Sequence, residues 1–304
     1  MVVASEQTAN EPRNPGPSWG FRVIHFWDTL LPTPVARWVR TGCAWVALGI
    51  MHRQRAASRE YMKTVLGRRA GLRDCAKQFD SFVTYLCDRI STAFGEPVHF
   101  EWAPGHGREF VDLMKRKETM LMGTFHVGYS DLMGFFMAEF DRPIHMLRLR
   151  LANAEDTERL EAFAGEHVKI VWVNEIEDAL FSIKEVIAQG GAVAMQCDRV
   201  QHASKLEVFE FLGAHRYFPF TIYWLSILFE VPVQFTIAGI RSTRNASVPV
   251  FTSPVFRPVQ SNRKENLQAA KQHFQGVLKL LEQQLKAQPE MWFNFEPLNP
   301  TQLP

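Results

Sequence analysis

The sequence has little of what marks several common classes of protein. Its cysteines are few and widely spaced, and none forms a Cys-x-x-Cys pair: Cys43, Cys75, Cys87 and Cys197. This spacing predicts neither a zinc site nor a disulfide framework. Buried thiols in a reducing compartment are the simplest interpretation.

Motifs for bound groups are missing as well. The chain has no glycine-rich phosphate loop and no dinucleotide fingerprint. His99, His106 and His126 show no helix-face pairing with a third metal ligand. We therefore expect neither a cofactor nor a bound metal. The net charge of +2 excludes a strongly charged chain and leaves room only for local charged patches.

The N-terminal region lacks a long hydrophobic run. Its uninterrupted apolar stretch, residues 43–51, is far shorter than the roughly 20 residues of a transmembrane helix, so we expect no bilayer span. Residues 1–18 are polar and proline-rich, without the basic start and apolar core of a secretory signal. We interpret these residues as a disordered lead-in.

Residues 19–75 form a segment of different character. Its tryptophans and arginines are interleaved: Trp27, Trp38 and Trp45 with Arg22, Arg37 and Arg40. This mixture is typical of a helix that lies in the membrane interface. A helix packed on the domain with partly buried tryptophans fits the pattern equally well, so both interpretations stay open.

Residues 52–73 within this segment are densely basic, against the single acidic residue Glu60. Anionic headgroups would attract such a segment by about 1 kcal/mol for each basic residue close to the membrane surface. A solvated helix face would carry the same charges. Because no nucleic-acid motif accompanies the run, we expect no nucleic-acid partner.

The rest of the chain alternates between strand and helix patterns. Strands are predicted over 98–102, 120–125, 143–149, 168–173, 192–196 and 231–240, and helices over 107–117, 130–139, 157–166, 177–189, 220–228 and 262–288. This alternation predicts an α/β domain over residues 76–304, with a mainly parallel central sheet and helices on both faces.

A histidine and a carboxylate five positions apart, His126 and Asp131, follow the predicted strand 120–125. A histidine can remove a proton from a hydroxyl or amine while a carboxylate holds the imidazole in the correct tautomer. The spacing alone is weak, since a loop histidine beside a helix-capping aspartate gives the same pattern. Asp198 and Arg199 also follow a predicted strand, so the two segments are expected to share a cleft at the carboxyl ends of the strands.

Four pieces of the chain match a known family in order: His126–Asp131, Gly190–Val200, Phe211–Gly213 with Phe218-Pro219, and the Trp-Phe-Asn-Phe run within Met291–Phe295. With them, the chain resembles the lysophospholipid acyltransferase superfamily, and more narrowly its lipid A late acyltransferase branch. The order and spacing of the pieces agree from about Trp19 to Phe295. Two departures are visible. Most lipid A enzymes have glutamate where this chain has Asp131, and the usual Arg-Pro followed by Asn is absent around Arg148.

The resemblance implies a role for each matching residue. His126 would be the general base and Asp131 its orienting carboxylate. Arg148 and Arg150 are equal candidates for stabilising the oxyanion. Arg199 would clamp a phosphate or carboxylate of the acceptor, with Asp198 holding Arg199 or ordering the loop, or forming only a structural salt bridge. Phe211, Gly213, Phe218 and Pro219 would shape the turn and wall of the acyl pocket. From its place after the helix stop at Pro289, the C-terminal run is itself expected to fold back and cover the core, with Asn294 offering its amide to a buried backbone group.

The implied activity is transfer of a fatty acyl group from a thioester, acyl carrier protein or coenzyme A, to an amphiphilic glycolipid or lipid A-like acceptor. The chain would act peripherally at the cytoplasmic face of the bacterial inner membrane, against an anionic surface. The basic segment would serve an acidic acyl carrier protein equally well. Two alternatives stay open: a thioesterase or tailoring acyltransferase on a soluble acceptor, and a non-catalytic lipid-binding protein of the same fold.

Overall fold

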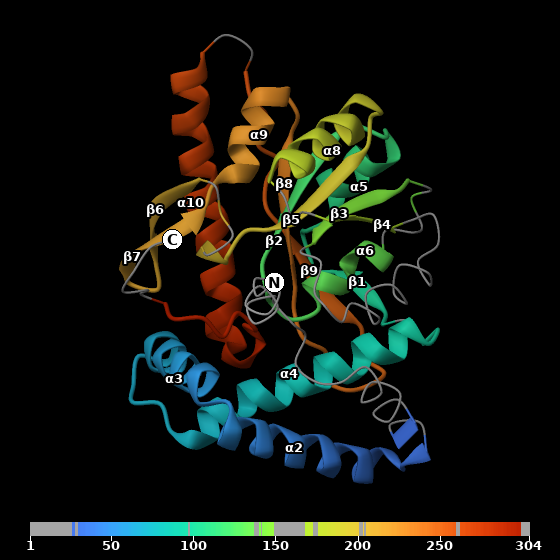
Figure 1. Ribbon diagram of the computed structural model, residues 1–304, viewed down its shortest axis with the longest axis vertical. Coiled ribbons are helices and arrows are strands. Elements are labelled where there is room, and N and C mark those ends of the chain that lie inside the picture. Colours follow the sequence, from blue (N-terminus) through green and yellow to red (C-terminus); the bar gives the residue numbers. More distant parts are fainter. Residues whose placement is uncertain are drawn as a thin grey trace, which may run out of the picture.

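The computed structural model describes residues 26–27, 30–96, 98–136, 140, 142–148, 168–172, 176–200, 203, 205–259 and 262–298. Its centre is a seven-stranded sheet in the order β1-β9-β8-β2-β5-β3-β4 (Figure 1). The strands are β1 (Phe100–Trp102), β2 (Met120–Thr124), β3 (Ile144–Arg148), β4 (Val168–Trp172), β5 (Ala192–Gln196), β8 (Val233–Ala238) and β9 (Val248–Thr252). All neighbouring pairs run parallel except β8 and β9. The predicted mainly parallel α/β fold is confirmed.

Both faces of this sheet are covered. Along β2, Leu121 packs in one hydrophobic cluster while Met120 and Met122 pack in another. The first cluster includes residues of α8 (Ile176–Ala188), α9 (Thr221–Phe229) and α10 (Arg263–Ala287), and the second residues of α5 (Arg108–Lys115) and α6 (Met133–Phe136). Because alternate side chains of a strand point to opposite faces, helices flank the sheet on both sides. Every residue of β2 and β8 is buried, as expected for central strands.

Three N-terminal helices lie against one end of this α/β unit: α2 (Thr33–Ile50), α3 (His52–Leu66) and α4 (Leu72–Ala93) (Figure 1). Ala44 and Leu48 of α2 pack on Cys75, Ala76 and Phe79 of α4. Farther along α4, Tyr85 joins the cluster on the sheet. α4 therefore continues without a break past residue 75, where the predicted N-terminal segment ends, and links that segment to the sheet. None of the helices that the structure describes is long and apolar enough to cross a membrane.

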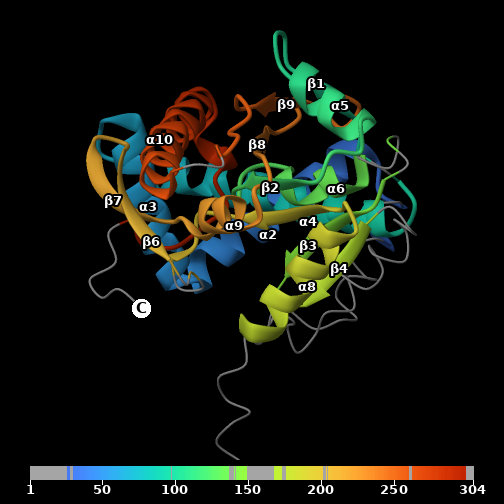
Figure 2. The same ribbon diagram turned by 90° about the horizontal axis from the view of Figure 1, so that it is seen from above.

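The segments between the predicted elements contain strands that the sequence patterns did not predict. One is β9, and the others form the antiparallel hairpin of β6 (Leu206–Phe211) and β7 (Ala214–Pro219). Both residues of its two-residue loop have positive φ, Leu212 at 49° and Gly213 at 73°, as the tight turns that suit strand twist require. Figure 2 shows the hairpin beside α10, at the opposite end of the molecule from α8 with β3 and β4.

Element boundaries otherwise fall close to the predicted ones. The predicted helix 130–139 begins as a 3-10 turn, η2 (Ser130–Leu132), before α6, and its last residues, 137–139, lie outside the described part of the chain. The predicted helix 157–166 also lies outside it. A second 3-10 turn, η6 (Pro289–Met291), follows α10. Asn262 caps the N-terminus of α10, because its side chain accepts hydrogen bonds from the backbone N–H groups of Lys264 and Glu265.

Candidate functional site

The site lies where β2 and β5 end side by side. The two strands pair in parallel, with Thr124 opposite Gln196, so the segments that follow leave the sheet at the same edge. The pairing continues one step further, as the backbone N–H of Cys197 donates to the carbonyl of Thr124 at 2.8 Å. His126 and Asp198 each come two residues after the end of their strand. This register brings together side chains that are 72 residues apart.

His126 sits at the start of a tight turn. Gly128 has φ +49°, and a Cβ at this position would lie 2.2 Å from the carbonyl oxygen of Gly239 and 2.3 Å from that of Ala238. Only glycine fits so close to the backbone after β8. The turn is also held at Tyr129, whose backbone N–H donates to the carbonyl of Gly239 at 3.2 Å. The position of the histidine therefore depends on the packing of this turn against the sheet.

A buried carboxylate holds the imidazole of His126. Nδ1 of His126 lies 2.7 Å from Oδ1 of Asp198, and the backbone N–H of His126 donates to Oδ2 of the same carboxylate at 2.9 Å. The Asp198 side chain is completely buried, whereas that of His126 is 19% exposed. The indole N–H of Trp292 also donates to Oδ2, at 3.1 Å. The carboxylate thus receives donors on both oxygens.

The electrostatics keep Asp198 ionised. Burial alone would raise the pKa of its carboxyl, but His126, Trp292 and the charge of Arg199 together bring that pKa below its ordinary value. An ionised carboxylate at Nδ1 requires the proton of the neutral imidazole to sit on that nitrogen. Nε2, which is bonded to no residue that the structure describes, is then left with a lone pair. A histidine held in this way can act as a general base.

Asp131 belongs to a separate ionic cluster. Its carboxylate lies 2.5 Å from Nη2 of Arg148 and 3.6 Å from Nε of Arg89, and it accepts a hydrogen bond of 3.1 Å from the hydroxyl of Tyr85. Burial would raise the pKa of the Asp131 carboxyl, but the two guanidinium groups lower it far below its usual range. Asp131 is therefore an ionised counter-charge for two arginines, one from β3 and one from α4.

This geometry corrects the expected partner of the histidine. The sequence led us to expect Asp131 at the imidazole, but the carboxylate bonded to the His126 ring is that of Asp198. The physical reason is that both oxygens of Asp131, which lies in η2, are taken by Arg148, Arg89 and Tyr85.

The comparison with known families decides the family of this chain. The family model of the bacterial lipid A biosynthesis acyltransferases matches residues 13–298. The chain belongs to this family. The match covers nearly the whole sequence, including the His126 turn, the Asp198 segment and the Trp292 segment, and it supports an enzyme that transfers acyl groups. A search of the curated proteins finds no match.

Of the two arginines predicted to stabilise the oxyanion, the structure describes only Arg148. Arg148 is the last residue of β3 and reaches the His126–Asp131 segment through its ion pair with Asp131. Its Nε is buried without a hydrogen-bond partner in the part of the chain that the structure describes. Arg150 lies outside that part. Stabilisation of an oxyanion by Arg148 in this acyltransferase family member stays a prediction.

Arg199 is held by a hydrogen bond to the C-terminal segment. The Asp198 carboxylate, which was one alternative for holding it, interacts with its charge and makes its hydrogen bonds elsewhere. Nε of Arg199 donates to Oδ1 of Asn294 at 3.4 Å, while the Asp198 side chain is bonded to His126 and Trp292. The amide of Asn294 in turn donates to the backbone carbonyl of Asp198 at 3.2 Å. The prediction that Asn294 offers its amide to a backbone group is confirmed. Binding of an acceptor phosphate by Arg199 is untested.

The residues predicted for the acyl pocket all lie in the β6–β7 hairpin. Phe211 and Phe218 are buried with their rings edge to face, centroids 5.1 Å apart, and Phe211 also contacts the ring of Trp292. Pro219 ends β7, and Gly213 is in the hairpin loop. Phe211 is thus linked to the site through Trp292. A role of these residues in binding the acyl chain stays a prediction.

Sequence reasoning missed three residues of the site: Tyr85, Arg89 and Trp292. Tyr85 and Arg89 lie four positions apart on α4, a spacing that places them on one helix face, but nothing in the sequence connects that face with Asp131. Trp292 lies within the recognised C-terminal run, which we expected only to cover the core. Its indole contact with Asp198 depends on how that run folds back onto the His126 turn.

Proposed function

We propose that this protein transfers a fatty acyl group from a thioester donor to a hydroxyl or amine of an amphiphilic glycolipid, with His126 as the general base and Asp198 as its orienting carboxylate. The observation that carries the proposal is the 2.7 Å contact between His126 and a completely buried Asp198 at the carboxyl edge of the sheet. Family membership supports acyl transfer. The buried pair supports a base with a defined tautomer.

The proposed reaction needs no covalent enzyme intermediate. Nε2 of His126 takes the proton of the acceptor hydroxyl or amine while the acceptor oxygen or nitrogen attacks the thioester carbonyl. The tetrahedral intermediate then collapses, the carbon–sulfur bond breaks, and the imidazolium returns the proton to the departing thiolate. Asp198 stays ionised throughout and stabilises the imidazolium, as a carboxylate on Nδ1 does in related constellations.

The negative charge on the intermediate needs a positioned donor. Arg148 is our candidate, because Asp131 and Arg148 form an ion pair of 2.5 Å that fixes the guanidinium beside the His126 turn. Asp131 then acts through Arg148 and not through the imidazole. Arg199, held by Asn294, is the candidate to bind a phosphate of the acceptor, since a guanidinium pairs with such groups in a bidentate way.

The outer face of α2 supports action at a membrane surface. Several of its apolar side chains are exposed while Ala44 and Leu48 are buried against α4; the exposed ones are Val35, Trp38, Val39, Trp45, Val46 and Ile50. Trp38 is 80% exposed. α4 supplies Tyr85 and Arg89 to the site from the other side of this helix pair. We propose that α2 lies in the interface of an anionic membrane leaflet, with the site next to the lipid acceptor.

The proposal also covers the carrier of the acyl donor and the location of the enzyme. We propose acyl carrier protein or coenzyme A as the carrier of the donor, and the cytoplasmic face of the inner membrane as the location. The exposed basic residues of α3, Arg53, Arg59 and Lys63, support an anionic partner of either kind.

The first test compares lipid extracts by mass spectrometry from cells that express the wild type, His126→Ala or Asp198→Asn. An acylated lipid is expected with the wild type, and its loss is expected with both variants. His99→Ala is the matched control, because His99 is an exposed histidine just before β1, the edge strand three places from β2 in the sheet, and should leave the product unchanged.

A second assay follows thiol release from acyl thioesters by the purified protein, with and without an acceptor lipid. Release that requires the lipid supports transfer, whereas equal release without it identifies a thioesterase. Unchanged extracts together with no thiol release by the wild type from either donor would overturn the proposed activity.

A further inference from the structure

The C-terminal segment Met291–Phe295 runs alongside the turn that carries His126. The carbonyl of Met291 accepts the backbone N–H of Gly128 at 2.7 Å, and the backbone N–H of Phe293 donates to the carbonyl of His126 at 2.7 Å. Between them, Val127 and Trp292 form an antiparallel bridge. The segment therefore behaves as a short extra strand that fixes the backbone on both sides of Val127, directly after the histidine.

Trp292 is the residue of this segment that reaches the carboxylate. Its indole N–H donates to Oδ2 of Asp198 at 3.1 Å, and its side chain is 96% buried, with the ring edge to face against those of Tyr61 and Phe211 at centroid distances of 4.8 and 5.5 Å. An indole N–H is a donor on a rigid ring, so it can hold an acceptor in one direction without taking its proton.

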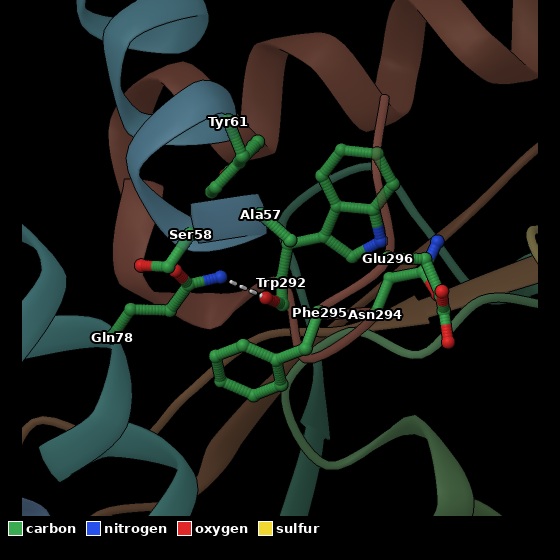
Figure 3. A pocket seen from close by; sticks show the side chains of 8 residues that line it. All are labelled: Ala57, Ser58, Tyr61, Gln78, Trp292, Asn294, Phe295 and Glu296. Carbon is green, nitrogen blue, oxygen red and sulfur yellow. Dashed lines mark hydrogen bonds between the residues drawn. The ribbon is translucent and has the colours of Figure 1, made fainter. Parts of the chain in front are cut away.

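The opposite side of Trp292 is anchored to the N-terminal helices. Its backbone carbonyl accepts a hydrogen bond from the side-chain amide of Gln78 on α4, and Gln78 in turn accepts one of 2.6 Å from Ser58 on α3. Figure 3 shows the carbonyl oxygen of Trp292 facing Gln78 and the indole nitrogen on the other side of the residue, beside a small pocket lined by these side chains. The hydrogen bond from Gln78 thus holds the backbone of Trp292 in place while the indole N–H donates to Asp198.

We propose that Trp292 is a positioning residue of the reaction: its indole N–H fixes the plane of the Asp198 carboxylate, so that Oδ1 stays on Nδ1 of His126 and Nε2 stays directed at the acceptor. This inference rests on the proposed function of His126. Without the indole, Oδ2 keeps only the backbone N–H of His126, and the carboxylate can rotate away from the imidazole.

The test compares Trp292→Phe with Trp224→Phe. Both changes replace an indole by a phenyl ring, but Nε1 of Trp224, on α9, is buried and has no hydrogen-bond partner among the described residues, so that variant loses no hydrogen bond. A phenyl ring can still lie under the guanidinium of Arg263, whose Cζ is 5.0 Å from the centroid of the Trp224 ring. We expect Trp292→Phe to lower kcat about 10- to 100-fold with little change in KM, as loss of a partner behind a reacting group commonly does. Trp224→Phe should stay near wild type.

The pH profile separates positioning from packing. A carboxylate that has rotated away from Nδ1 stabilises the protonated imidazole less, so the acidic limb of kcat/KM should move to lower pH in Trp292→Phe. A residue that only fills space would lower the rate at all pH values and leave the limb in place. An unmoved limb, or equal losses in the two variants, would overturn the inference.

A measurement that needs no turnover keeps this inference separate from the proposed function. Nitrogen-15 NMR of the histidine rings, with His126 assigned by its absence in His126→Gln, reports which ring nitrogen carries the proton. We expect the wild type to hold the proton on Nδ1 and Trp292→Phe to show a mixture of tautomers. Identical spectra would reject the positioning role even if no acyl transfer were found, whereas the expected difference without activity would reject only the proposed reaction.

Discussion

At the scale of single residues, the two aspartates near His126 are both ionised and make different contacts. Asp198 is bonded to the histidine and the indole, and Asp131 to two arginines. Each carboxylate has a pKa below its ordinary value, because its partners outweigh the effect of burial. Replacing each by asparagine removes the charge with little change in shape, which separates catalytic from structural effects.

Asp131→Asn is expected to destabilise the fold. It removes the charge of Asp131 from its ion pairs with Arg148 and Arg89 in a largely buried place, which costs about 2–3 kcal/mol of unfolding free energy once the partial exposure of the three side chains is allowed for. Urea unfolding followed by circular dichroism measures the change. Asp112→Asn, at an exposed position on α5, is the control and should shift the midpoint little. A midpoint for Asp131→Asn equal to that of the control would show that the ion pairs add no stability.

At the scale of elements, α2 combines the two arrangements that its sequence pattern left open. One face packs on α4 through Ala44 and Leu48, and the other exposes Trp38, Val46 and Ile50. The helix is therefore both packed on the domain and able to present aromatic and aliphatic side chains to a membrane. An exposed apolar stripe of this kind marks an interaction surface.

Trp38→Ala is expected to weaken binding to vesicles that contain anionic lipid. Loss of an exposed tryptophan that would enter the interface costs on the order of 1–2 kcal/mol, or about tenfold in the partition coefficient. Co-sedimentation with vesicles at several salt concentrations measures the effect. Phe181→Ala removes a 72% exposed aromatic from α8 and should leave binding unchanged. Equal effects of the two substitutions would exclude α2 as the binding surface.

The sequence predicted the central strands well, but it did not predict β9 or the β6–β7 hairpin. The central strands are short apolar runs bounded by turn residues, and their patterns match the observed ranges closely. β9 was missed because Pro249 lies inside it, and proline argues against a strand that pairs on both sides. The β6–β7 hairpin alternates between buried and exposed residues, yet the family motif within it led us to expect only a turn and a wall.

At the scale of the whole molecule, four carboxyls with lowered pKa values make stability depend on pH. One is Glu118, whose pKa is lowered by its hydrogen bond from Arg257. The pKa values of Asp131 and Asp198 are lowered, and Arg68 together with the backbone N–H of Gly71 lowers the pKa of Asp74 to about 2. A carboxyl with a lowered pKa in the folded state binds its proton first in the unfolded state as the pH falls. Its contribution to stability is therefore complete well above the ordinary carboxyl pKa of about 3.9 and is lost below it.

We expect the unfolding free energy to fall modestly between about pH 7 and 5, because burial lowers the pKa of His145 and His273 and the unfolded chain takes up these protons first. It should fall steeply below about 4, where the carboxyls bind protons. Urea unfolding at a series of pH values measures this, and Asp131→Asn should reduce the slope of the fall because one of the contributing carboxyls is gone. Stability that rises toward acid pH, or an unchanged slope in the variant, would contradict this account.

By itself the sequence determined the class of fold, the order of most strands and helices, and the segments that gather at the site. These follow from local patterns, because the spacing of the apolar residues in a strand or helix predicts which of its faces is buried. It also determined that His126, Asp198 and Arg199 follow strand ends. Only the tertiary structure decided which carboxylate meets the imidazole. That choice depends on the parallel register of β2 and β5 and on the arginines from β3 and α4 that occupy Asp131, and no local pattern specifies such long-range pairings.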